Sequence, residues 1–168
     1  MIQRLSFWIM MIVCSVMVSG QEYDGYYTNP ILPSGADPWV VKHEGWYYYC
    51  SGVPGGIGVS RSRDLHKINP PVRVWKVPEK GQWNSTCVWA PELHFWKGKW
   101  YIYYAADDGN TDNHQMYVLE NVNRDPFDGE FVMKGRISTD KDNNWAIDGS
   151  VFQNKGELYM VWSGWQTR

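Results

Sequence analysis

Several features that would place the chain in a familiar functional class are missing from its 168 residues. Sixteen Lys and Arg stand against 18 Asp and Glu, so the formal net charge is −2, without the basic excess that nucleic acid or an anionic membrane requires. Three cysteines are too few for a disulfide scaffold, and a bond between Cys50 and Cys87 stays open. No Gly-x-Ser-x-Gly, His-Glu-x-x-His, Walker or Cys-x-x-Cys motif occurs, which leaves serine-hydrolase, zincin and nucleotide-driven chemistry without support.

The first twenty residues have the composition of a secretory signal peptide. Arg4 is the only charge before an uncharged stretch from Phe7 to Val18, and Val18-Ser19-Gly20 supplies the small residues that a signal peptidase reads. The apolar stretch is too short to span a bilayer comfortably. We therefore predict a signal peptide over 1–20, a mature domain over 21–168, and a secreted or periplasmic location.

Aromatic residues, by contrast, are abundant. They make up 16% of the chain, with 11 Trp and 11 Tyr. Such residues favour β-strands, and their flat faces suit sugar rings, although most of them are expected to fill a core. The sequence shows no amphipathic helix of useful length and no low-complexity linker.

Three ungapped internal repeats organise the chain. Each has the pattern of a strand, a tight turn at a glycine and a second strand rich in Tyr and Trp. The glycine comes eight residues after the first position every time, in repeats that begin at Asp37, Ala90 and Asp148. The starts are 53 and 58 residues apart. Repeats of this length, made of consecutive hairpins, are typical of β-propeller blades.

The rest of each repeat can supply the two further strands that a propeller blade needs. We expect these additional strands, two for each of the first two blades, at 57–62, 72–75, 116–120 and 130–134. The third repeat reaches only its second strand before Arg168, and two and a half blades cannot close a ring. The pattern therefore predicts an all-β chain that is the N-terminal part of a longer propeller: blades I and II and the start of blade III.

Four segments carry a more specific signal, in one order and at blade spacing. They are Asn29-Pro-Ile-Leu-Pro-Ser-Gly-Ala-Asp37-Pro, Val88-Trp-Ala-Pro-Glu92-Leu-His, Gly98-Lys-Trp-Tyr-Ile-Tyr-Tyr-Ala-Ala-Asp107 and Trp145-Ala-Ile-Asp148-Gly-Ser. Together they resemble glycoside hydrolase family 43, five-bladed β-propeller enzymes that act on arabinose- and xylose-containing polysaccharides. The resemblance extends from about Tyr27 to Trp165, and it is greatest to the arabinofuranosidases of the family.

The resemblance implies inverting hydrolysis, in which a carboxylate activates water on one face of the sugar and a carboxylic acid protonates the leaving oxygen. It implies that Asp37 is the general base and that Asp148 orients the acid and tunes its pKa. The acid itself would be a glutamate on a fourth blade, outside this chain, so we expect these 168 residues alone to be inactive. We predict no cofactor, and nothing in this segment supports a structural cation on the propeller axis.

The repeat supports the two aspartates independently of the resemblance. Asp37 and Asp148 share the first register position, so both should face one end of the central channel at similar depth. Crowding two acids in a partly desolvated pocket raises the pKa of at least one of them. The second repeat has Ala90 there, so the register alone does not require an acid. The alternative is that both are turn aspartates, before Pro38 and Gly149.

Three further residues are candidates for contact with a sugar. Trp89 and Trp145 flank the innermost strands, where their rings could stack on a furanose or pyranose, and packing between blades is the alternative. Glu92 shares the strand face of Ala90, and its alternative is a structural hydrogen bond to a neighbouring blade. The segment 107–114 resembles a calcium loop only superficially, because its glycine is misplaced and its twelfth position is not Glu. We therefore predict no metal site, and a polar pocket rim where the two aspartates that open the segment could contact sugar hydroxyls.

We therefore expect a secreted, exo-acting α-L-arabinofuranosidase that trims arabinose from plant polysaccharide. β-Xylosidase and endo-arabinanase stay open as alternatives, because loops on later blades decide between these activities. A non-catalytic carbohydrate-binding propeller is the alternative from a different class, and two acids in matching positions argue against it. The expected partner is a polysaccharide or oligosaccharide, with no nucleic acid and, after signal cleavage, no membrane.

Overall fold

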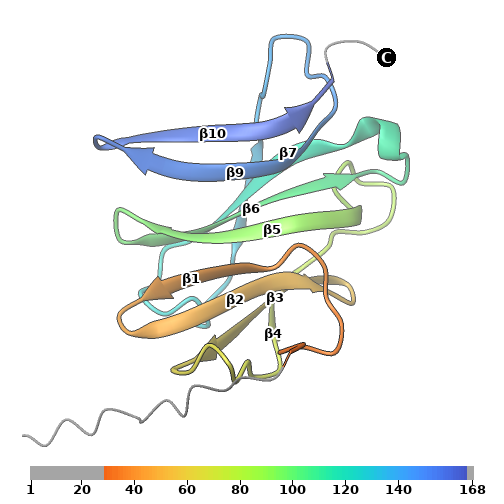
Figure 1. Cartoon of the computed structure of the whole chain (residues 1–168). Helices are drawn as coiled ribbons and strands as arrows, with labels where there is room; N and C mark the ends of the chain where they lie inside the picture. Colours follow the sequence, from red (N-terminus) through yellow and green to blue (C-terminus); the bar gives the residue numbers. More distant parts are fainter. Residues whose placement is uncertain (1–28, 166–168) are drawn as a thin grey trace, which may run out of the picture.

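The computed structural model describes residues 29–165, which form three antiparallel sheets (Figure 1). The predicted signal peptide lies outside the described residues. Two of the sheets have four strands and the third has two. Within residues 29–165 the one helical element is the 3-10 turn η1, Thr111–Asn113, and no helix there is long and apolar enough to cross a membrane.

Each sheet is a meander in which strands that follow one another along the chain are neighbours. The first sheet has the order β1-β2-β3-β4, with β1 Trp39–His43, β2 Trp46–Val53, β3 Gly56–Ser62 and β4 Val72–Lys76. The second has the order β5-β6-β7-β8, with β5 Thr86–Trp96, β6 Lys99–Asp107, β7 Gln115–Asn121 and β8 Val132–Arg136. The third pairs β9, Ala146–Asn154, with β10, Glu157–Gly164. The prediction of an all-β chain built from propeller blades is confirmed.

The hairpins predicted at the repeat glycines are present in all three sheets. In each turn the glycine and the residue before it both have positive φ, at Glu44-Gly45, Lys97-Gly98 and Lys155-Gly156. Two consecutive positive φ values define the type I′ turn, whose twist matches that of the flanking strands. Glycine adopts the second of these conformations without a steric penalty, which explains its fixed place in the repeat.

Two strands begin later than the sequence predicts. The fourth strand of the second blade was expected at 130–134, but β8 begins at Val132, because the preceding turn continues through Gly129 at φ 68°. β1 begins at Trp39, so Asp37 is not its first residue. The intervening Pro38 has no N–H to donate to a ladder.

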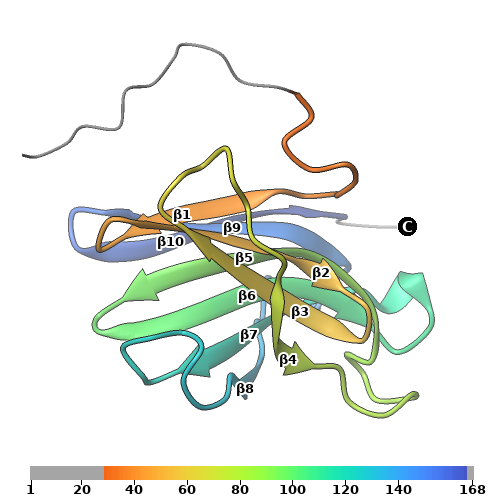
Figure 2. The same cartoon turned by 90° about the horizontal axis from the view of Figure 1, so that it is seen from below.

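The three sheets pack on one another, with β5–β8 in the middle (Figures 1 and 2). Figure 2 shows β4 and β8 at the edge of the molecule opposite β1 and β9. Tyr104 and Tyr117 belong to a large core between the first and second sheets, whereas Ala105 and Met116 belong to a smaller cluster between the second and third. This alternation follows the two-residue period of a strand. Cys50 is buried in the larger core and is free, as is the exposed Cys87, so no disulfide joins them.

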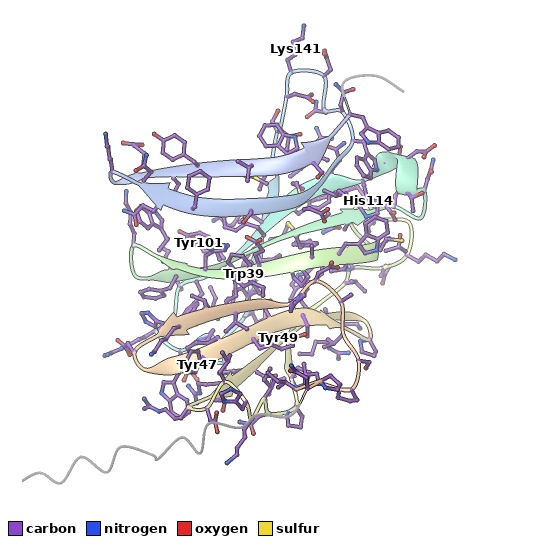
Figure 3. The ribbon with its side chains drawn as sticks, in the orientation of Figure 1. Trp39, Tyr47, Tyr49, Tyr101, His114 and Lys141 are labelled. Carbon is purple, nitrogen blue, oxygen red and sulfur yellow. The ribbon has the colours of Figure 1, made fainter. Side chains whose placement is uncertain are left out.

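Side-chain hydrogen bonds join the first and second sheets. Trp39 lies at this boundary (Figure 3), and its Nε1 donates to the carbonyl O of Leu93 at 2.7 Å. Its ring centroid lies 4.8 Å from that of His94. Trp39 therefore packs between blades, the role that sequence analysis kept as the alternative for a tryptophan on an innermost strand.

Candidate active site

The three register-equivalent positions share an unusual backbone conformation. Asp37, Ala90 and Asp148 have φ values of 49°, 43° and 52°, in the left-handed region that non-glycine residues seldom adopt. Asp and Asn enter this region more readily than Ala does. Because Ala90 also adopts it, the conformation belongs to the place in the blade and not to the residue that occupies it.

In the second and third sheets this place is a β-bulge. Ala90 and the residue after it together oppose the single residue Tyr104 of β6. Asp148 and the residue after it likewise oppose Trp162 of β10. A bulge bends its strand and changes the direction of a side chain. The Asp148 carboxylate therefore does not have to follow the alternation of side chains between the two faces of β9.

Asp37, just before the first sheet, and Asp148, on β9 of the third sheet, interact electrostatically. Partial burial of the Asp148 carboxyl and the negative charge of Asp37 raise the pKa of Asp148, and the nearby His114 opposes this shift. Both aspartate side chains are exposed in the described part of the chain. Asp148 therefore retains its proton to a higher pH than an isolated aspartate would.

A hollow of about 510 Å³ opens beside Asp37. Tyr49 of β2 (Figure 3) and Trp89 and Ala90 of β5 also line it. Its volume falls in the range of about 300–1,000 Å³ that small-molecule sites occupy. The Trp89 side chain is 37% exposed, so a flat indole face is available next to the carboxylate. Such a face suits the apolar side of a sugar ring.

The structure places Glu92 away from this hollow. Its Oε2 lies 3.0 Å from Nε2 of His94 and accepts a hydrogen bond from the backbone N of Val151, on β9, at 3.4 Å. This is the structural bond to a neighbouring blade that sequence analysis kept as the alternative. Contact between Glu92 and a sugar stays a prediction.

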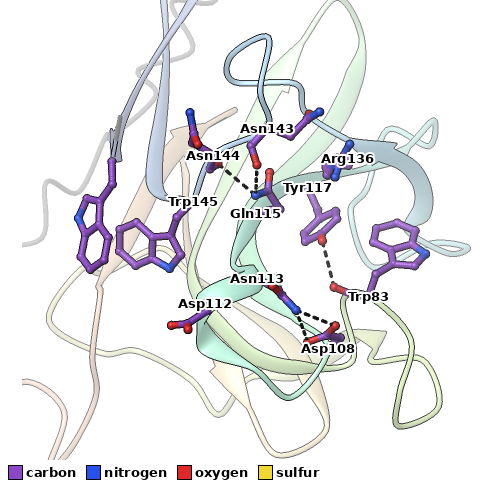
Figure 4. Close-up of a pocket in the computed structure, with 11 residues that line it drawn as sticks. Trp83, Asp108, Asp112, Asn113, Gln115, Tyr117, Arg136, Asn143, Asn144 and Trp145 are labelled. Carbon is purple, nitrogen blue, oxygen red and sulfur yellow. Dashed lines mark hydrogen bonds between the residues drawn. The ribbon is translucent and has the colours of Figure 1, made fainter. Parts of the chain in front are cut away.

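Trp145 lines a different hollow, built mainly from loops of the second sheet (Figure 4). Its Nε1 donates to the carbonyl O of Thr111 at 2.8 Å, and its ring centroid lies 4.8 Å from that of Trp165. The two predicted tryptophans therefore line two different hollows: Trp89 lines the one beside Asp37, and Trp145 lines the one beside the loops of the second blade.

A buried histidine lies between these two tryptophans, and sequence reasoning did not single it out. The His114 ring stacks on Trp89 with centroids 4.0 Å apart and lies 6.4 Å from the Trp145 ring. Its Nε2 is 3.0 Å from the carbonyl O of Cys87. Its Nδ1 is 3.0 Å from Oδ2 of Asp107 and 3.3 Å from the carbonyl O of Thr111. All three neighbours are hydrogen-bond acceptors, so a proton on either ring nitrogen has a carbonyl or carboxylate oxygen close by.

Asp107 is the buried counterion of His114. It accepts hydrogen bonds from the Thr86 hydroxyl and, at 2.9 Å, from the backbone N of Gly109. Burial acts to raise the pKa of Asp107, but these hydrogen bonds and the charge of His114 outweigh it and lower the pKa. Since Asp107 has no exposed surface, the suggestion that it contacts sugar hydroxyls is wrong. Its partner His114 lies seven residues away, on the other side of a loop. The two-residue alternation of a strand therefore does not predict this pairing from the sequence.

The rest of this loop is exposed and held by its own side chains. Asp108 accepts from the backbone N of Asn110 and from Nδ2 of Asn113. Over residues 29–165 no group of three or more His, Cys, Asp or Glu side chains is placed to hold a metal ion.

Consecutive antiparallel meanders packed blade on blade define the chain as part of a β-propeller. Equivalent positions with a left-handed backbone in two blades supply a pair of carboxylates, Asp37 and Asp148. The sequence model described as "Glycosyl hydrolases family 43" matches residues 27–168. The chain therefore belongs to glycoside hydrolase family 43, as its motifs predicted.

Curated relatives in this family are arabinofuranosidases. The chain is 34% identical over 142 residues to α-L-arabinofuranosidase 43 of Humicola insolens, a match that covers 82% of this chain and 29% of that protein. It is 34% identical over 145 residues to the extracellular exo-α-(1->5)-L-arabinofuranosidase of Streptomyces avermitilis, with the same coverage. The chain thus spans less than a third of the length of these two relatives.

Solved structures show the same fold. A thermostable family-43 glycoside hydrolase superposes with a TM-score of 0.65 at 26% identity, over 82% of this chain and 44% of that one. An endo-arabinase from Bacteroides thetaiotaomicron gives a TM-score of 0.65 at 18% identity, over 82% and 48% of the two chains. At 18% identity this second similarity shows the fold alone.

Proposed function

We propose that the protein carrying this chain is an inverting, exo-acting α-L-arabinofuranosidase. The observation that carries the proposal is the placement of Asp37 and Asp148 at the same left-handed position of two blades, where they interact electrostatically and Asp37 lines a hollow with an exposed tryptophan. The arabinofuranosidase names of the relatives support the choice of sugar.

In this proposal Asp37 is the general base. Its carboxylate is exposed at the hollow, where a water molecule can lie between it and the anomeric carbon of a bound sugar. General-base catalysis of this kind contributes about 10²–10⁴-fold to a rate. Asparagine tolerates the left-handed backbone at this position as well as aspartate does, so the base can be removed with little disturbance of the fold.

Asp148 would act on the general acid instead of on the sugar. A second carboxyl group in the same site disfavours ionisation of its neighbour through like-charge repulsion, so Asp148 would raise the pKa of the general acid. The family resemblance implies a general acid on a fourth blade, and we include that acid in the proposal. A base and an acid on opposite sides of the propeller channel would stand about 6.5–9.5 Å apart, the separation of inverting enzymes.

Trp89 would provide the stacking face for the arabinofuranose. Its ring is fixed from behind by His114, so that little conformational entropy is lost when a sugar packs on it. We also propose that residues 1–20 export the protein, and the extracellular description of the Streptomyces avermitilis relative supports this.

The experiment that tests this function is hydrolysis of an aryl α-L-arabinofuranoside, followed by proton NMR at early times. We expect the β-anomer of arabinose to appear before mutarotation, because water attacks the face opposite the leaving group. An aryl β-xyloside separates the xylosidase alternative, and linear arabinan cut internally separates the endo-acting one. Early release of the α-anomer would contradict the role of Asp37 as a base, and binding of saccharide without hydrolysis would indicate a non-catalytic propeller.

A further inference from the structure

The hollow beside Trp145, here called the tryptophan hollow, has a volume of about 580 Å³ (Figure 4). The lining residues that matter here are Trp83, Asp108, Arg136, Asn143, Trp145 and Trp165. It lies apart from the hollow of Asp37, and the two share no lining residue. Its volume also falls in the range of about 300–1,000 Å³ typical of small-molecule sites.

Side-chain hydrogen bonds fix the walls of the tryptophan hollow (Figure 4). Gln115 Nε2 donates to the carbonyl oxygens of Asn143 and Asn144 at 2.9 and 3.1 Å. The Tyr117 hydroxyl donates to the carbonyl O of Trp83 at 3.0 Å. Two loops that are distant in sequence are therefore held open around a preformed space, which reduces the entropy lost on binding.

Three tryptophans present aromatic surface to this space. Trp83 is 47% exposed and Trp165 is 50% exposed, and Trp145 lies between the open space and the buried His114. The rings form a row, from Trp89 at the Asp37 hollow through His114 and Trp145 to Trp165, with successive centroids 4.0, 6.4 and 4.8 Å apart. Contacts between aromatic rings therefore run from one hollow to the other through a histidine that is itself buried.

The polar groups of the tryptophan hollow suit hydroxyl groups. Arg136 is exposed, its guanidinium makes no hydrogen bond or ion pair within the described residues, and it offers five N–H donors. Asp108 offers carboxylate lone pairs on the other side. With Asp108 and Asp112 against the one Arg136, the local charge disfavours a phosphate or a uronic acid.

We propose that the tryptophan hollow is a second saccharide-binding site, which holds a neutral sugar unit of a polysaccharide. Stacking on tryptophan, hydrogen bonds donated by Arg136 and hydrogen bonds accepted by Asp108 provide the recognition. The site needs neither Asp37 nor turnover, so it stands whether or not the hydrolytic proposal holds.

The test measures binding of soluble linear arabinan to the whole protein, made inactive by Asp37→Asn, with isothermal titration. Adding Trp83→Ala and Arg136→Ala together should weaken binding about tenfold, since truncation of a Trp or Arg anchor commonly costs more than a kilocalorie per mole. Trp83→Phe keeps a ring and should lose less. Arg73→Ala is the matched control, because Arg73 is an exposed arginine on β4 outside the hollow, and it should bind as the parent does.

A second readout locates the sugar without relying on a variant that folds. In two-dimensional NMR the indole N–H signal of Trp83 should shift as arabinan is added, and polygalacturonate, an anionic polymer, should leave it in place. The proposal is overturned if the double variant binds arabinan as tightly as its parent, or if the Trp83 signal does not respond to arabinan. A response to polygalacturonate as large as that to arabinan would also overturn the assignment to neutral sugars.

Discussion

Asp107 and Asp148 are both aspartates at the ends of the blades, yet their surroundings give them opposite properties. Asp107 is fully buried, and hydrogen bonds and His114 lower its pKa. Asp148 is exposed, and partial burial of its carboxyl and the charge of Asp37 raise its pKa. A carboxylate stabilised by hydrogen bonds and by an opposite charge supports the fold. A carboxyl group close to a second carboxylate has a raised pKa and is suited to proton transfer.

The second blade sharpens this distinction. Ala90 has the same bulge and nearly the same φ as Asp148, with no carboxylate at all. The left-handed conformation is therefore a property of the blade, and the acids at Asp37 and Asp148 are additions to it. Substitutions at these positions should separate effects on the rate from effects on stability.

The largest effect is expected for Asp37→Asn in the whole protein. Turnover of an aryl α-L-arabinofuranoside should fall by about 10²–10⁴-fold, because the base is lost while the volume and the left-handed backbone are kept. The thermal unfolding midpoint should stay close to that of the parent. Near-normal turnover in this variant would remove Asp37 from the mechanism.

Asp107→Asn should act mainly on stability. It removes the counterion of a buried His114, and breaking a buried pair costs about 3–5 kcal/mol. Denaturant unfolding at neutral pH measures the loss. Because the folded-state pKa of Asp107 is lowered, its contribution is present above the unfolded value of about 3.9 and is lost as the pH falls through the folded value. The difference between variant and parent should therefore shrink in acid, and a difference that is constant with pH would contradict a charged Asp107.

Ala90→Gly should have the smallest effect and the opposite sign. Glycine adopts a φ of 43° without the Cβ strain of alanine, so the variant should be more stable by about 1 kcal/mol or less. Chemical denaturation of the two proteins side by side measures this difference. A destabilised glycine variant would show that the Ala90 methyl group contributes packing that outweighs the strain.

The sequence was sufficient for the fold because its repeats carry the strand pattern, and the glycine at a fixed place in each repeat sets the I′ hairpin. It also placed Asp37 and Asp148 in one register. It could not show the bulge, since a positive φ at Ala90 leaves no mark on composition or periodicity. Nor could it show the pairing of His114 with Asp107, which depends on how a loop folds back over β6.

The central claim is that Asp37 and Asp148 share one electrostatic site. The most direct test is an NMR titration of the Asp148 carboxyl, with carbon-labelled aspartate, in the parent protein and in Asp37→Asn. We predict a pKa for Asp148 above the ordinary value of about 3.9 in the parent and a clear decrease toward it in the variant, because the negative charge of Asp37 is gone. An Asp148 pKa that is the same in both proteins would contradict the claim.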